Sequence, residues 1–390
     1  MVGVTLGWMT VVPRPDRSDD QAPGGARPSS DEPVTVLHSR RVEPGREADF
    51  EMAGSGRARI LAIDVVRGLA VVGMLLVNNA GIPAAMPQAL RHASWQGLTL
   101  ADQVFPLFLF TVGASMPLSR RAQRPGAVLR RVVVLFLLGS LLVSAKQHRL
   151  APSTGVLQQI AGAYLVAWAL LRLPRRAQLP AAALLLAGLW AAFTFVSAPG
   201  VRPGSWAPGS NLADFVDRLL LGHFSEHGVL VMVASSVSVL AGVAAGRLLR
   251  GPPAGTTRRL LALGAGMLAL GLLVAVAVPI GKPLWTPSFV LVTAGISALL
   301  TAAVHRLVDR GPGRSWARPL VTLGSNALAL YAASVLLFAF LLKPWQAALV
   351  RPLAAAGGGT FAALAYAAGT VLVTWALAEW LYWRRVFVRV

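Results

Sequence analysis

A histidine and an aspartate stand close together just ahead of a strongly apolar run. They are His92 and Asp102, in the stretch RHASWQGLTLADQVFPLFLF at residues 91–110. A carboxylate beside an imidazole fixes its tautomer and raises its basicity, which suits the imidazole to deprotonate an amine or hydroxyl, or to carry an acyl group. Thr99 and Asp102 would equally suit the N-terminus of a helix that begins near Thr99, so a purely structural role stays open on spacing alone.

Further polar residues fall inside apolar segments. Asn78 ends one such segment, and the same segment holds Asp64 and Arg67, which share a helix face because they are three residues apart. An ionisable residue inside a membrane costs about 2.5–3.5 kcal/mol, so the pair must face protein or water. It is either an ion pair that holds helices together or a polar wall for a cofactor. Other intramembrane polar residues could simply join helices by hydrogen bonds; they are Gln158, Gln159, Asn326, Tyr331 and Glu379. Gln158 is also a candidate for binding the substrate or cofactor.

The composition is that of a membrane protein. Of the 390 residues 55% are hydrophobic and 13% charged, whereas soluble domains carry roughly 25% charged residues. The chain has no cysteine, which excludes disulfides, thiolate metal sites and a cysteine nucleophile. Its six histidines are scattered and no metal-ligand motif occurs, so no metal site is expected.

The apolar residues come in blocks near the ~20 residues that a bilayer-spanning helix requires. We therefore expect an all-α, polytopic integral membrane protein with about ten transmembrane helices in one bundle. Residues 1–56 are rich in Pro, Gly, Ser and charge and predict a disordered cytoplasmic tail, ahead of one transmembrane domain at 57–390. The expected spans are 60–80, 100–119, 128–146, 155–172, 179–198, 229–248, 260–280, 288–306, 319–342 and 361–383.

The basic residues predict an orientation. The net charge of +20 could suggest nucleic acid as a partner, but the arginines cluster at alternate ends of the apolar blocks, as the positive-inside rule expects, so we expect none. Both termini then lie in the cytoplasm of a multi-pass cell-membrane protein. The connections 81–99, 147–154, 199–228, 281–287 and 343–360 face outward, and His92 lies in the first of them.

Several stretches resemble one family, the multi-spanning acyltransferases typified by heparan-α-glucosaminide N-acetyltransferase. The most specific are RILAIDVVRGLAVVGMLLVNNAG at 59–81 and HASWQGLTLADQVFPLFLFTVGASMPLS at 92–119, with weaker ones at 155–165, 214–224, 281–295 and 323–331. The resemblance implies transfer of an acetyl group from cytoplasmic acetyl-CoA to a glucosamine amine across the membrane. It makes His92 the active histidine, with Asn78 and Asp102 as polar neighbours. It also places further residues along the path, without a catalytic step: Trp95, Lys282, Trp285, Ser288 and Asn326.

The chain departs from that pattern at two places. Gln159 stands where the family usually has an arginine, and SEHG at residues 225–228 stands where it has an acidic DPEG stretch. If those groups bind the acceptor sugar or the cofactor phosphates, the substrate of this chain differs.

The hypothesis is a pocket open to acyl-CoA on one side and to an amino-sugar or glycan acceptor on the other. His92, oriented by Asp102, is the general base or a transient acyl carrier, and Asn78 donates to the developing oxyanion. The CoA phosphates are expected to bind arginines at the cytoplasmic helix ends, namely Arg130, Arg131, Arg258 and Arg259. Two other classes stay open, a transporter of amino sugars or other small solutes and a non-catalytic membrane scaffold. A homodimer is also left open.

Overall fold

The computed structural model describes residues 10–11, 60–119, 122, 124–147, 154–310 and 315–387. The tail expected to be disordered, residues 1–56, lies outside the described residues apart from Thr10–Val11. Those two residues form strand β1, which pairs antiparallel with strand β2, Val386–Phe387. The two end segments of the chain therefore meet.

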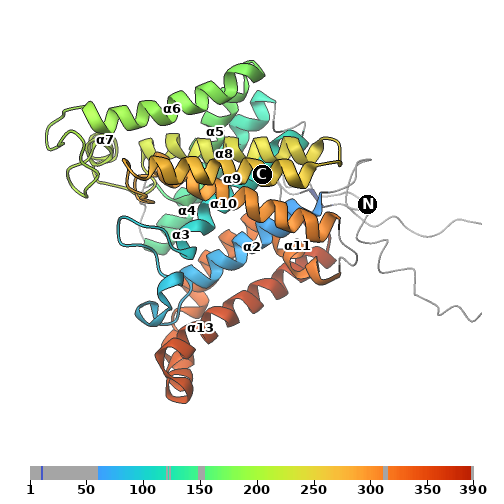
Figure 1. The fold of residues 1–390 in the computed structure, drawn as a ribbon. Helices are drawn as coiled ribbons and strands as arrows, with labels where there is room; N and C mark the ends of the chain where they lie inside the picture. The colour runs from blue at the N-terminus through green and yellow to red at the C-terminus, as the bar shows by residue number, and fades with distance from the viewer. Residues whose placement is uncertain are drawn as a thin grey trace, which may run out of the picture.

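The described residues form a bundle of helices, which confirms the all-α expectation (Figure 1). Helices α6 and α13 lie at opposite edges of the bundle, and α7 lies at the left-hand end of the view. In chain order the helices are α2 (Leu61–Asn78), α3 (Leu100–Ser115), α4 (Pro125–Gln147), α5 (Val156–Leu171), α6 (Arg175–Phe195), α7 (Leu212–Leu221), α8 (Val229–Arg250), α9 (Thr256–Val274), α10 (Pro287–Val304), α11 (Arg318–Ser325), α12 (Ala327–Leu336) and α13 (Gln346–Trp383).

Eight of the helices in the described part of the chain are long and apolar enough to cross a membrane. The pair α11 and α12 adds a ninth if the two count as one span, since they are bent by 68° at a short break. Helix α5 is apolar but has only 16 residues. A polytopic membrane protein is confirmed, whereas the count of ten is not.

Two connections that the sequence suggested contain α-helix. Residues 343–360 were expected to be a loop, but α13 begins at Gln346 and breaks only at Gly358, whose φ of 79° is accessible to glycine at little cost. The connection 199–228 contains α7, where the side chain of Asn211 accepts a hydrogen bond from the Asp214 N–H at 3.0 Å and so caps the helix.

Close packing of small residues joins α3 to α8 at the centre of the bundle. A Cβ added to Gly113 would lie 1.9 Å from the Val239 carbonyl oxygen, and one added to Gly242 would lie 1.9 Å from the Phe110 carbonyl oxygen. Only glycine lets the two backbones approach so closely, as is common between membrane helices. Helix α5 also packs against α8, so α3, α5 and α8 form one packed group.

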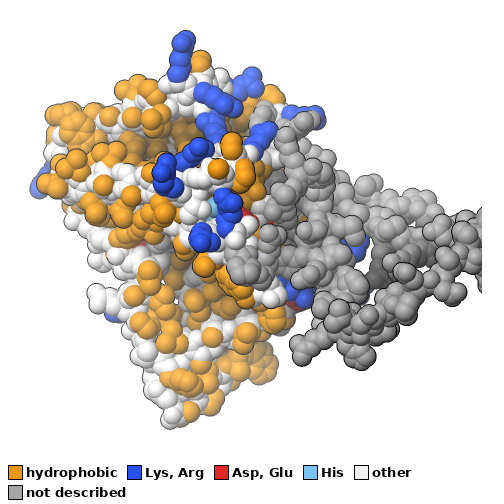
Figure 2. All heavy atoms as spheres, turned by 45° about the vertical axis from the view of Figure 1, so that its right-hand side comes forward, with side chains coloured by type: hydrophobic (Ala, Val, Ile, Leu, Met, Phe, Trp, Pro, Cys, Tyr) orange, Lys and Arg blue, Asp and Glu red, His pale blue; other side chains and the backbone are white. Residues whose placement is uncertain are grey.

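The two ends of this group differ in chemistry. Arginines gather where α5 and α8 end and α6 begins, and we call this the basic end; Figure 2 looks toward a face where Lys and Arg side chains gather among apolar surface. The N-terminus of α3 and the connection with His92 lie at the opposite end, which we call the His92 end. Helix α3 therefore runs from the His92 end to the basic end.

Candidate active site

His92 and Asp102 are in contact, as the sequence predicted. The His92 Nδ1 atom lies 2.7 Å from the Asp102 Oδ1 atom. A carboxylate can only accept, so this contact favours the tautomer that donates its Nδ1–H to Asp102, and in the neutral ring the Nε2 atom is then the acceptor. The Asp102 side chain is 1% exposed and that of His92 is 43% exposed, so a buried anion orients an imidazole that solvent or a substrate can reach.

Asp102 also performs the structural role that the sequence left open. Its Oδ2 atom accepts from the Ala93 N–H at 3.0 Å and the Thr99 N–H at 3.2 Å, and Thr99 and Asp102 form a capping box at the start of α3. One carboxylate oxygen thus anchors the connection before α3, and the other oxygen holds His92. The capping contact and the contact with His92 are thus both present, and the catalytic role of Asp102 stays a prediction.

Lys282 completes a cluster with these two residues. Its Nζ atom lies 3.6 Å from Asp102 Oδ1 and 3.0 Å from His92 Nδ1. A tight turn presents the lysine, because Thr286 N–H donates to the Gly281 carbonyl at 3.1 Å and Trp285 N–H donates to the Lys282 carbonyl at 3.0 Å. Burial lowers the pKa of Lys282, while the nearby charges of Asp102 and Glu226 oppose that change.

A cavity of about 200 Å³ adjoins this cluster, and we call it the His92 cavity. Its walls are mostly apolar and come from α2, α3, α5 and α12, together with the connections that precede α3, α8 and α10. Most small-molecule sites have this character, with a few convergent polar groups on an apolar lining. The polar groups are Asn78, His92, Glu226, His227, Lys282 and Tyr331. The predicted neighbour Asn78 therefore lies on the same cavity as His92.

A second imidazole, His227, lies on this cavity and was not among the predicted site residues. Its Nδ1 atom is 2.6 Å from the Gln159 Oε1 atom. The two places where the sequence departs from the family it resembles are thus in direct contact. Burial, and then the charge of Lys282, lower the pKa of His227 from its usual 6.5 to about 4, so the ring is neutral near pH 7.

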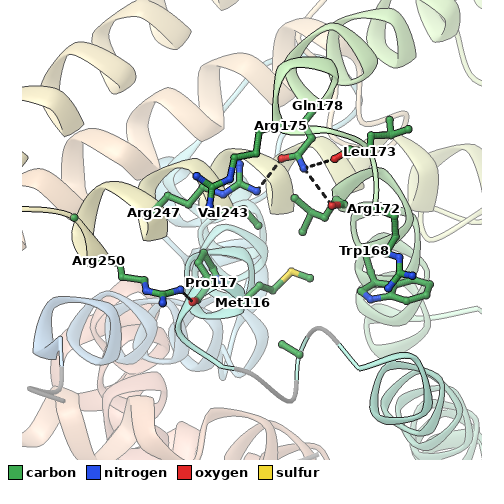
Figure 3. Close-up of a pocket in the computed structure, with 13 residues that line it drawn as sticks. Met116, Pro117, Trp168, Arg172, Leu173, Arg175, Gln178, Val243, Arg247 and Arg250 are labelled. Atoms are coloured by element: carbon green, nitrogen blue, oxygen red, sulfur yellow. Dashed lines mark hydrogen bonds between the residues drawn. The ribbon is translucent and has the colours of Figure 1, made fainter. Parts of the chain in front are cut away.

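A larger cavity of about 640 Å³ opens at the basic end, and we call it the basic cavity (Figure 3). Arginines from three segments line it, namely Arg172, Arg175, Arg247 and Arg250, and no carboxylate is among the described residues of its lining. Arg247 donates to the Gln178 Oε1 atom at 2.8 Å, and Figure 3 shows Arg175 beside it. Four cations without an anion among them make a site that favours a negatively charged ligand.

The two cavities lie toward opposite ends of the same helices. Phe108 of α3 and Ile160 of α5 line the His92 cavity, whereas Met116 and Trp168 line the basic cavity. Each pair is eight residues apart along its segment, which corresponds to about 12 Å of helix. Only a short layer of packed side chains thus separates the cavities.

Of the other predicted residues, Trp285 lies on the His92 cavity and is buried. Its φ of 49° and its 3.3 Å hydrogen bond from Nε1 to the Ser238 Oγ atom fix it in the turn beside Lys282. The ion pair of Arg67 and Asp64, at 3.2 Å, lines neither cavity. Arg67 also donates to the Gly324 carbonyl at 3.3 Å, so this pair joins α2 to α11.

Four more predicted residues also lie away from both cavities. The Trp95 Nε1–H donates to the Trp206 carbonyl at 2.7 Å, and the Ser288 hydroxyl donates to the Pro279 carbonyl at 3.0 Å. Gln158 is buried and lies 3.3 Å from the Ser140 Oγ atom. Asn326, at the break between α11 and α12, donates to the Val386 carbonyl at 3.0 Å. In the structure each of these side chains makes a contact that holds segments together.

The arginines predicted to bind CoA phosphates also lie outside the lining of the basic cavity. Arg130, Arg258 and Arg259 are exposed, and the Arg131 guanidinium stacks over the Tyr164 ring at 4.5 Å. The sequence suggested adjacent basic pairs, whereas the structure brings together arginines from three helix ends that are not adjacent in sequence. Within the described residues, no group of His, Asp and Glu side chains could hold a metal ion.

Comparison with known proteins now adds to this geometry. A family model described as heparan-alpha-glucosaminide N-acetyltransferase, catalytic, matches residues 59–216. The chain is 28% identical over 351 residues to a Homo sapiens protein named heparan-alpha-glucosaminide N-acetyltransferase, covering 70% of this chain and 52% of that protein. It is 27% identical over 403 residues to the Mus musculus protein of the same name, covering 82% of this chain and 61% of that protein.

Over its matched part the chain is therefore similar to heparan-α-glucosaminide N-acetyltransferases. It spans between about half and three-fifths of the length of the relatives it matches. The matched region at 59–216 contains Asn78, His92 and Asp102 but ends before His227 and Lys282. The part of the His92 cavity formed by His227 and Lys282 therefore lies outside the residues that the family model matches.

Proposed function

We propose that this protein is a membrane N-acetyltransferase that moves an acetyl group from acetyl-CoA to the amine of a glucosamine-type sugar or envelope glycan. One observation carries the proposal: an oriented imidazole faces a cavity at one end of α3, α5 and α8, and an arginine-lined cavity opens at the other end of the same helices. By the positive-inside rule the basic end is cytoplasmic, which places the acceptor outside and the donor inside. Both chain termini are then cytoplasmic and the cell membrane is the location.

The chemistry proposed for His92 follows from its tautomer. The unprotonated Nε2 atom takes a proton from the acceptor amine while the amine nitrogen attacks the thioester carbonyl. The carbon–sulfur bond then breaks, and the departing thiolate takes up the proton, so that the amine and acetyl-CoA become the amide and free CoA. In a two-step variant His92 carries the acetyl group in between. Asn78 makes no hydrogen bond to the described residues, which leaves its amide free to donate to the oxyanion.

The donor is proposed to enter at the basic end. The phosphates of acetyl-CoA suit guanidinium groups, which bind phosphate oxygens with two parallel hydrogen bonds. Arg172, Arg175, Arg247 and Arg250 would hold them, and the basic cavity has the size of a small-molecule site. The narrow pantetheine arm would pass between α3, α5 and α8 to bring the thioester to His92.

A transporter of amino sugars is the second candidate, since α11 and α12 form a broken span and broken helices commonly carry the binding sites of transporters. The break itself lies at Asn326, which lines neither cavity. Uptake of labelled glucosamine into proteoliposomes without acetyl-CoA would support transport. Acetylation of glucosamine trapped inside, with acetyl-CoA supplied only outside, supports transfer across the membrane.

The proposal is tested with purified protein, radiolabelled acetyl-CoA and glucosamine. His92→Ala should lower turnover roughly 10²–10⁴-fold, the usual contribution of a general base. His223→Ala is the matched control, because His223 is exposed and lines neither cavity, and its turnover should not change. Full activity of the His92→Ala variant would remove His92 from the reaction.

A further inference from the structure

The connection between α7 and α8 carries two polar residues to the His92 cavity, and it is held in place firmly. The buried Asp217 carboxylate accepts from the Ser225 N–H at 3.3 Å and from the Val229 N–H at 3.1 Å. A Cβ added to Gly228 would lie 2.0 Å from an Asp217 oxygen, so the chain can pass here only as glycine. Glu226 and His227 are thus presented to the cavity by a fixed turn.

The His227 ring is fixed in both orientation and tautomer. Its Nδ1 atom donates to the Gln159 Oε1 atom at 2.6 Å, since an amide oxygen can only accept. Its ring meets Phe105 edge to face, with centroids 6.2 Å apart, and Phe105 meets Trp285 in the same way at 5.5 Å. The Nε2 atom is therefore an acceptor, and it makes no hydrogen bond to the described residues.

The charges around His227 keep it in this acceptor form. The charge of Lys282 helps to lower the pKa of His227, and the charges of Asp102 and Glu226 oppose the lowering of the Lys282 pKa. A second proton on His227 would place a positive charge beside that ammonium group in a partly buried wall. With Nδ1 donating to Gln159, the ring offers one lone pair to whatever enters the cavity.

We infer that His227 is a specificity-determining residue of the acceptor site, whose Nε2 atom accepts a hydrogen bond from an amine or hydroxyl of the acceptor. The inference rests on the proposed transfer reaction and extends it to the acceptor. His92 acts on the nucleophilic nitrogen, and His227 binds a second hydrogen-bond donor of the same molecule. The exposed carboxylate of Glu226, on the same cavity, adds an acceptor that also suits an ammonium group. The substrate class is therefore a small molecule with an amine next to further hydroxyl groups, and an anionic acceptor is disfavoured.

The test compares the kinetics of His227→Phe with wild type, at saturating acetyl-CoA and varied glucosamine. Phenylalanine keeps the ring that packs on Phe105 and removes both nitrogens. Loss of one buried hydrogen bond should raise the KM for glucosamine roughly tenfold to a hundredfold. The kcat should change little, because the bond is made equally in the ground and transition states. His227→Gln, which keeps an acceptor, should recover part of the affinity.

His223→Phe is the matched control, since this exposed histidine lies on the same connection but lines neither of the two cavities. Its KM should equal that of wild type. An unchanged KM for glucosamine in His227→Phe overturns the inference, and so does a fall in kcat at constant KM. If wild type itself transfers no acetyl group to glucosamine, the proposed function fails instead. Thermal unfolding of each variant shows whether the fold is intact, and the His227→Gln variant decides the matter if His227→Phe does not fold.

Discussion

Replacing Asp102 by asparagine separates the two roles of this carboxylate. In the native protein Oδ1 accepts from His92 at 2.7 Å, and Oδ2 accepts from the backbone N–H groups of Ala93 and Thr99. An asparagine that keeps its oxygen at the Oδ2 position still satisfies both backbone groups. Its NH₂ group then faces His92 and donates to Nδ1, so the imidazole must carry its proton on Nε2. The histidine is held in place but in the wrong tautomer to take a proton.

The expected loss in kcat is close to the full contribution of general-base catalysis. That contribution is typically 10²–10⁴-fold, or about 3–5 kcal/mol in the activation free energy. The free energy of unfolding should change far less than the activation free energy, because the capping box at the start of α3 is kept. The measurement is the initial rate of acetyl transfer at saturating acetyl-CoA and glucosamine, with the Tm in detergent measured alongside.

Thr99→Ala is the control for the capping role. It removes a hydroxyl that lies 3.0 Å from Asp102 Oδ2 and 2.8 Å from the Arg91 carbonyl, and it leaves the contact with His92 in place. Loss of a cap costs about 0.5–2 kcal/mol of stability, and kcat should stay within a few fold of wild type. Undiminished kcat in Asp102→Asn would refute the reasoning about the tautomer. An equal loss of kcat in Asp102→Asn and Thr99→Ala would show that kcat depends on an ordered connection before α3 and not on the tautomer of His92.

Two further predictions concern the basic cavity and His227. Arg247→Gln should raise the KM for acetyl-CoA roughly tenfold to a hundredfold through loss of charge-assisted hydrogen bonds. Arg306→Gln changes an exposed arginine outside the cavity lining and should leave this KM unchanged. Equal effects of the two substitutions would show that the arginines only set the orientation in the membrane. The pKa of His227 is lowered from 6.5 to about 4 by burial and Lys282, so the unfolded chain binds more protons between these pH values and stability is lost as the pH falls through them. His227→Gln should remove up to about 3 kcal/mol of this loss in the free energy of unfolding, and a plot of Tm against pH should be flatter as a result. Identical pH profiles for variant and wild type would contradict the prediction.

The helices could be predicted well from the sequence because a bilayer imposes a simple length and polarity rule. α2, α8 and α10 lie within a few residues of the expected spans. One segment near the C-terminus differs from the expectation. Residues 346–357 were expected to be in a loop because the spacing suggested a single span after residue 361, but they form a separate helical segment before the break at Gly358.

The site was only partly predictable, and the reason is geometric. His92 and Asp102 lie close in sequence, so their contact follows from local spacing. Lys282 comes from the far half of the chain, and only the resemblance to a family suggested it. The arginines of the basic cavity belong to three segments, and whether such side chains converge depends on the rotation and packing of each helix. Adjacent pairs such as Arg130 and Arg131 stand out in a sequence, yet neighbours on a helix point in different directions.

The contact between Gln159 and His227 gives physical meaning to the two departures from the family pattern. The resemblance suggested them as two separate departures, at Gln159 and at residues 225–228. The structure joins them in one hydrogen bond of 2.6 Å, on the wall of the His92 cavity. An arginine retained at position 159 beside His227 would be a buried cation without a counter-ion, which typically costs 3–5 kcal/mol. Gln159 and His227 instead form a neutral amide–imidazole pair in which the His227 Nε2 atom can only accept a hydrogen bond. This wall should therefore select acceptor substrates that carry hydrogen-bond donors, and not those that carry a negative charge.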